Sequence, residues 1–191
     1  IFNARQIEAT TNGDFHYLTE KYYNGKVLKE NPEALILGDW HQGDTCPKVR
    51  KATIKMIEDL KPKRVVFHDL FNGHAINHHE ELHLLSELRS IRDKRFGLKQ
   101  EMTGVYNEMK FFAEKFPEVK FLVVRSNHDD FLERYVQERR FVPHGQNFMF
   151  VCELIPRLID EKKIPLKEAL SLIGAIPFNF HFIQEDDSYR V

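Results

Sequence analysis

The stretch ALILGDWHQGD, residues 34–44, decides how this chain folds. Its first four residues form a short apolar run after Pro32, and such a run predicts a buried β-strand. Gly38 ends the run, and the polar residues that follow it predict a loop. The stretch therefore predicts a strand that delivers a loop at its carboxyl end.

The same pattern recurs further along the chain. Beyond 34–37, the apolar runs predict strands at 64–67, 119–124 and 178–183. Apolar residues at helical spacing predict helices at 49–60, 80–95, 102–116, 131–138, 148–160 and 166–173. Strands that alternate with helices are typical of an α/β domain with a parallel sheet. Residues 1–30 show only weak patterns, and we interpret them as a lead-in segment.

Length and composition limit the classes of protein that this chain can belong to. A chain of 191 residues with 42% hydrophobic residues can bury the core of one domain. The formal net charge of -1 excludes a simple electrostatic DNA binder, so any contact with nucleic acid must be local. Cys46 and Cys152 lack zinc-ligand spacing, and the apolar runs are too short to span a membrane. We therefore expect a cytoplasmic protein without a membrane partner.

Polar side chains follow three of the predicted strands. Asp39 and His41 follow the first, Asp69 follows the second, and Asn127 and His128 follow the third. Ligands of parallel sheets bind beyond the carboxyl ends of the strands, so these side chains should converge. Carboxylate, imidazole and amide groups together suit manganese, iron or zinc. The spacing predicts a metal site at this edge.

Two divalent metals at roughly 3.5–4 Å from each other can activate water and neutralise the charge of a phosphoester during in-line displacement. His128, next to the proposed ligand Asn127, could then act as a general acid toward the leaving alkoxide or hold the phosphate. For Asp39 and His41 alone, a solvated loop is the simpler interpretation. The recurrence at three strand ends favours the metal site.

Residues 35–132 resemble the calcineurin-like metallophosphoesterase superfamily, through Asp-x-His at 39–41, Asp-Leu-Phe at 69–71 and Asn-His-Asp at 127–129. The Asp-Leu-Phe sequence is most similar to the DNA-cutting branch, the SbcD-type repair nucleases and related phage nucleases. The resemblance implies a four-layer α/β/β/α sandwich, a dinuclear centre that prefers Mn²⁺ over Mg²⁺, Fe²⁺ or Zn²⁺, and metal-dependent hydrolysis of DNA phosphodiesters as an endo- or exonuclease.

By motif position, the resemblance also implies individual roles. Asp39 and His41 would bind the first metal, Asp69 would bridge both, Asn127 would bind the second, and His128 would be catalytic. DNA would be the partner, with an accessory ATPase or self-association as further possibilities, in a bacterium or in the host of a phage.

The chain departs from the family pattern at two glycines and at its end. His68 and Ser126 stand where the family has glycine. The family's later His and its Gly-His-x-His motif do not occur, so we expect a sandwich that is incomplete at its C-terminus. The remaining candidates for metal or substrate contact are His181, His144 and His74.

Several alternatives stay open. The same centre could serve a metallophosphatase that acts on a small phosphomonoester or nucleotide, and the absent motif would also fit a catalytically reduced binding or assembly module. His78, His79 and His83 could bind metal or form a solvated helix start. Trp40 could stack on a base, although packing under the metal loop is its more common role. Asp44 is interpreted as a turn residue or a partner of the ligands.

Overall fold

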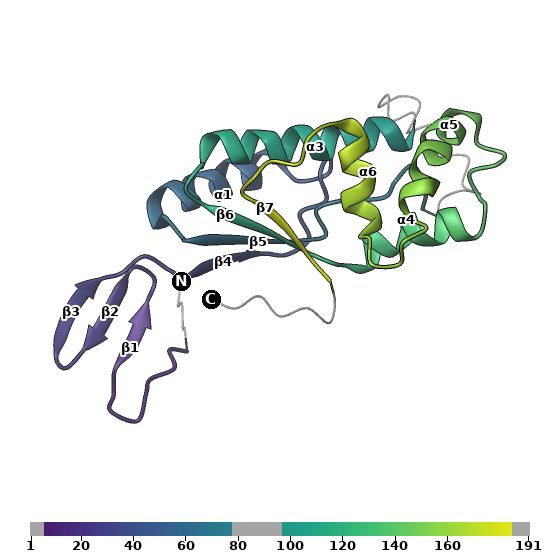
Figure 1. Ribbon diagram of the computed structural model, residues 1–191. Helices are drawn as coiled ribbons and strands as arrows, with labels where there is room; N and C mark the ends of the chain where they lie inside the picture. Colours follow the sequence, from purple (N-terminus) through teal and green to yellow (C-terminus); the bar gives the residue numbers. More distant parts are fainter. Residues whose placement is uncertain (1–5, 78–96, 185–191) are drawn as a thin grey trace.

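A four-stranded parallel sheet forms the centre of the structure, a computed structural model that describes residues 6–77 and 97–184 (Figure 1). The strands lie in the order β4 (Ala34–Leu37), β5 (Arg64–His68), β6 (Lys120–Val124) and β7 (Phe180–Ile183). All three pairings are parallel. The predicted α/β class with a parallel sheet is confirmed.

Two helices, α1 (Pro47–Leu60) and α3 (Leu98–Lys115), cover one face of this sheet (Figure 1). Between helices and sheet lies an aromatic core, in which the ring of Phe67 lies 5.3 Å from that of Phe112. Trp40 is 3% exposed and meets both rings edge-on, at 5.4 and 5.6 Å. The prediction that Trp40 packs beneath the loop is confirmed.

The opposite face of the sheet carries Ile36, whose side chain points away from its core-facing neighbours Leu35 and Leu37. Ile36 is 74% exposed. Parallel sheets usually have both faces covered, and the second sheet of a four-layer sandwich would lie on this face. That second sheet remains a prediction.

The last helices gather near the carboxyl ends of the strands: α4 (Asn127–Gln137), α5 (Gly145–Leu154), the 3₁₀ turn η1 (Ile155–Arg157) and α6 (Pro165–Ile173) (Figure 1). A buried polar network joins them to α3. The amide of Asn147 donates to the hydroxyl of Tyr135 at 2.9 Å and accepts the backbone N–H of Leu98 at 2.8 Å. Tyr135 in turn contacts Nδ1 of His144 at 2.8 Å. These bonds fix where α3 begins.

A separate antiparallel sheet precedes the main domain, with strands β1 (Phe15–Tyr17), β2 (Glu20–Tyr23) and β3 (Lys26–Lys29) (Figure 1). We predicted no strands in this lead-in. Asn24 and Gly25 both adopt positive φ, 50° and 71°, and form the two-residue turn between β2 and β3. An Asn-Gly pair is a strong hairpin signal that the weak flanking pattern obscured.

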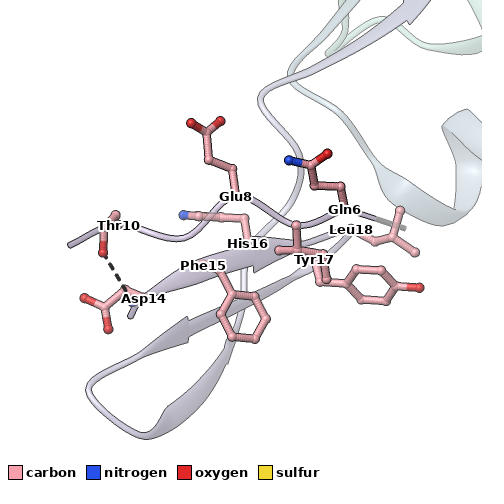
Figure 2. Close-up of a pocket in the computed structure, with 9 residues that line it drawn as sticks. Gln6, Glu8, Thr10, Asp14, Phe15, His16, Tyr17 and Leu18 are labelled. Atoms are coloured by element: carbon pink, nitrogen blue, oxygen red, sulfur yellow. Dashed lines mark hydrogen bonds between the residues drawn. The ribbon is translucent and has the colours of Figure 1, made fainter. Parts of the chain in front are cut away.

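A shallow pocket of about 350 Å³ opens beside β1, between the small sheet and the residues that precede it (Figure 2). Within it, the backbone N–H of Asp14 donates to the Thr10 hydroxyl at 3.2 Å. Strand β1, which lines this pocket, lies away from the carboxyl ends of the parallel strands (Figure 1).

Most predicted elements within the described residues are confirmed, but several helices begin earlier than predicted. α1 begins at Pro47, α3 at Leu98 and α4 at Asn127. Ser126 is the N-cap of α4, and the Asp129 carboxylate accepts the Ser126 N–H at 3.1 Å as part of a capping box. The helix predicted at 80–95 lies outside the described residues. Among the helices that are described, none combines the length and apolar character of a membrane span.

Candidate metal centre

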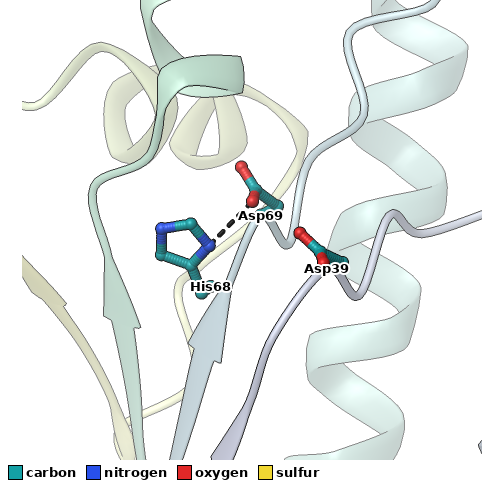
Figure 3. A group of neighbouring side chains, drawn as sticks. All are labelled: Asp39, His68 and Asp69. Carbon is teal, nitrogen blue, oxygen red and sulfur yellow. Dashed lines mark ion pairs between the residues drawn. The ribbon is translucent and has the colours of Figure 1, made fainter.

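Two neighbouring strands bring three potential ligands together. Asp39 follows β4, His68 ends β5 and Asp69 follows it, and because β4 and β5 pair in parallel their carboxyl ends meet (Figure 3). One ligand atom from each residue lies within 4.8 Å of the others. The convergence expected for Asp39 and Asp69 is therefore present in the fold.

The backbone at this edge adopts an uncommon conformation. Asp39, His41 and Asp69 have φ values of 49°, 44° and 52°, in the left-handed region that side chains disfavour. Such positions cost on the order of 1–3 kcal/mol each and persist only where the surroundings fix them. Here the N–H of His41 donates to the carbonyl of Asp69 at 2.7 Å, and the N–H of Gln42 to that of Leu70 at 3.1 Å.

Charge is concentrated and incompletely balanced at the site. Asp69 is 3% exposed, and its Oδ2 lies 2.7 Å from Nδ1 of His68. Its Oδ1 is buried without a hydrogen-bond partner in the described part of the chain, as are Oδ1 of Asp129 and Nδ1 of His41. Burial, and secondarily the charge of Asp69, raises the pKa of Asp129 to about 7, although a bond from the Ser126 N–H opposes this.

No family model, curated protein or solved structure matches the chain. The evidence for a metal site is therefore the chemistry of the three side chains that converge here. Two carboxylates and an imidazole with ligand atoms within 4.8 Å, one of them the Asp69 carboxylate whose buried Oδ1 has no partner among the described residues, fit a divalent cation of the manganese, iron or zinc type. A cation would also offset the charge of Asp69, which adds to the effect of burial on the pKa of Asp129.

His128 lies beside this group and has a defined orientation. Its ring centroid is 4.5 Å from that of His41 and 4.9 Å from that of Phe131. Nδ1 of His128 lies 2.6 Å from the backbone carbonyl of Asn72. Because a carbonyl can only accept, Nδ1 carries the hydrogen in this contact and Nε2 is left for a substrate.

The resemblance also implies two further ligands, His41 and Asn127. Nε2 of His41 is 3.9 Å from Oδ1 of Asp39, so the two sit on one loop as expected. Asn127 is exposed at the first position of α4, directly before His128. It occupies a helix turn rather than the loop that the sequence predicted.

Sequence reasoning missed His68 as a member of the site. We noted it only as a departure from glycine. Adjacent residues of a regular strand point to opposite faces, so a ligand role for both His68 and Asp69 was not expected. The left-handed conformation of Asp69 breaks this alternation, and its carboxylate turns toward the His68 ring.

The remaining candidates are distributed differently. Nε2 of His74 contacts the Asp44 carboxylate, which also accepts the Asn72 side-chain amide at 2.7 Å. Asp44 thus bonds His74 and Asn72, which follow β5. His144 bonds Tyr135 at the start of α5, and His181 lies exposed on β7; neither belongs to the three-residue group. His78, His79 and His83 lie outside the described residues.

Proposed function

We propose that this chain is a metal-dependent phosphoesterase that hydrolyses DNA phosphodiester bonds, with Mn²⁺ as the first choice of cation. One observation carries the proposal: the carboxylates of Asp39 and Asp69 converge with His68 at the sheet edge where His128 is held beside His41. Carboxylates for cations and an oriented imidazole for proton transfer are the parts that phosphoester hydrolysis requires.

The side chains that converge at the sheet edge would bind the cations. Asp39, His68 and Asp69 would hold one cation, and by the resemblance His41, Asp69 and Asn127 would take part in holding two. When bound, the cations would neutralise phosphate charge and help to generate the nucleophile from water.

His128 would move the proton. The Asn72 carbonyl accepts the Nδ1–H at 2.6 Å, so Nε2 is the atom that would carry the second proton of the imidazolium form and pass it to the leaving alkoxide, which returns His128 to the neutral Nδ1–H form.

Plasmid cleavage with Mn²⁺ tests the proposal. Asp69→Asn and His128→Asn should each abolish cutting, because each removes one function of the site while preserving side-chain size. Asp59→Asn and His16→Asn are matched controls on exposed positions and should cut like wild type. Cutting that survives both site substitutions would refute the proposal.

One observation favours a second candidate, a metallophosphatase for a small phosphomonoester or nucleotide. The chain has a formal net charge of -1, whereas proteins that hold long polyanions usually gain affinity from excess positive charge. Release of phosphate from a chromogenic monoester, without any cutting of DNA, would support this alternative. Failure to bind Mn²⁺ at all would favour a binding module instead.

A further inference from the structure

A single carboxylate from α3 holds the loop that follows β5. Oε1 of Glu101 accepts the backbone N–H groups of Gly73 and His74 at 2.7 and 3.0 Å, and Oε2 accepts that of Ala75 at 3.1 Å. Three consecutive N–H groups thus point at one side chain. Such a nest of N–H groups suits an anion, and an ionised carboxylate is a pure acceptor with two oxygens to share.

The carboxylate is enclosed by the protein. The side chain as a whole is half-buried, but burial raises the pKa of Glu101, whereas the three N–H bonds act in the opposite direction. Burial of a carboxylate costs free energy unless the group is hydrogen-bonded, and the N–H groups of residues 73–75 supply those bonds. The same bonds tie the segment 73–75 to α3.

That segment is also constrained from α4. Gly73 has a φ of +79°, and a Cβ there would come within 2.9 Å of the Phe131 ring. Phe131 in turn packs on His128. The loop is therefore held between Glu101 on one side and Phe131 on the other, which leaves little freedom for the preceding residue.

That preceding residue is Asn72, whose carbonyl contacts Nδ1 of His128. We propose that Glu101 is a positioning residue: by holding the loop 73–75 it sets the Asn72 carbonyl, which keeps the hydrogen of His128 on Nδ1 and leaves Nε2 for proton transfer. The catalytic importance of Nε2 rests on the proposed function, whereas the tautomer of His128 does not.

Two substitutions separate this role from general stability. Glu101→Ala removes all three acceptors, whereas Glu101→Gln keeps one oxygen and places an NH₂ group where Oε2 accepts the Ala75 N–H. Glu108→Gln is the matched control, because Glu108 lies on the same helix and its carboxylate accepts two bonds from Arg50, at 2.7 and 2.9 Å. It alters a comparable contact that does not reach the loop.

The tautomer of His128 is the first measurement, by ¹⁵N-resolved NMR of the imidazole in the full chain without added metal. We expect wild type and Glu108→Gln to carry the hydrogen on Nδ1, and the Glu101 variants to show a mixture with the Nε2–H form. A wild-type His128 that carries its hydrogen on Nε2 would overturn the proposal without any variant, as would Glu101 variants with an unchanged tautomer.

Cleavage kinetics give the second measurement. Loss of a residue that orients a catalytic group typically lowers activity about 10- to 100-fold. We expect kcat to fall by that factor in Glu101→Ala, with KM nearly unchanged and a shifted pH–rate profile, while Glu108→Gln retains kcat. If no protein cuts DNA, the proposed function fails, yet the NMR measurement still decides the role of Glu101.

Discussion

Raising the pH should destabilise the metal-free protein, because Asp129 is buried where its charged form is disfavoured. The side chain is 8% exposed, and burial, together with the nearby charge of Asp69, raises its pKa from 3.8 to about 7. The folded state then binds this proton more tightly than the unfolded state does. The protonated Asp129 side chain therefore favours the folded state. This contribution to the unfolding free energy is fully present below about pH 4 and is lost as the pH rises through about 7.

The magnitude follows from the two pKa values. Their difference, at about 1.4 kcal/mol for each tenfold change in proton affinity, corresponds to about 4 kcal/mol of unfolding free energy. About 3 kcal/mol of this lies between pH 4.5 and 8. The pKa of Glu101 is raised as well, so its contribution has the same sign.

Urea denaturation of wild type and Asp129→Asn, in a chelator at pH 4.5 and pH 8, measures the effect. Asparagine cannot ionise, so the variant should lack this part of the pH dependence, and the difference between the two proteins removes contributions that they share. Asp59→Asn, at an exposed position, should behave like wild type. If the unfolding free energy changes by the same amount between pH 4.5 and pH 8 in wild type and in Asp129→Asn, the role assigned to the buried Asp129 charge is refuted.

Three further perturbations have defined outcomes. Gly73→Ala should lower the unfolding free energy by about 1–3 kcal/mol in a thermal melt, because φ is +79° and the new Cβ would meet Phe131. Asn147→Ala should cost about 2–3 kcal/mol in urea, since it leaves the N–H of Leu98 without its acceptor in a fully buried site. Mn²⁺ at 100 times its Kd should stabilise wild type by about 2.7 kcal/mol and Asp69→Asn far less, as measured by the shift in Tm.

Each of these has a control in the same chain. Gly25→Ala also places a side chain at positive φ but meets no atom within 4 Å, so it should cost less than Gly73→Ala. Gln146 is exposed and adjacent to Asn147, so Gln146→Ala should leave the unfolding free energy nearly unchanged. A Tm shift with Mn²⁺ that is as large in Asp69→Asn as in wild type would place the ion elsewhere.

The sequence was informative about the sheet because burial of apolar side chains determines it. The run 34–37 became β4 with the predicted ends, and the polar residues after β4 and β5 met at one edge. Parallel strands end at the same edge of the sheet, so this convergence can be predicted without knowledge of individual side-chain contacts.

Contacts between distant residues were harder to foresee. α3 begins four residues before its predicted start because Asn147, 49 positions away, accepts the first N–H of the helix. His68 lies in the site because Asp69 adopts a left-handed backbone conformation, and the pattern of apolar residues does not predict a positive φ. Glu101 lies one residue before the predicted helix 102–116, and its bonds to the loop 73–75, 26 to 28 positions away, have no counterpart in a local sequence pattern.

The left-handed backbone at Asp39, His41 and Asp69 has a consequence for engineering this protein. Glycine adopts that conformation without the steric penalty of a Cβ, so a search for stabilising substitutions guided by backbone geometry would select these three positions first. Each such exchange would relieve local strain and delete a side chain that we propose takes part in cation binding. Variants chosen for heat resistance alone should therefore lose the proposed affinity for cations.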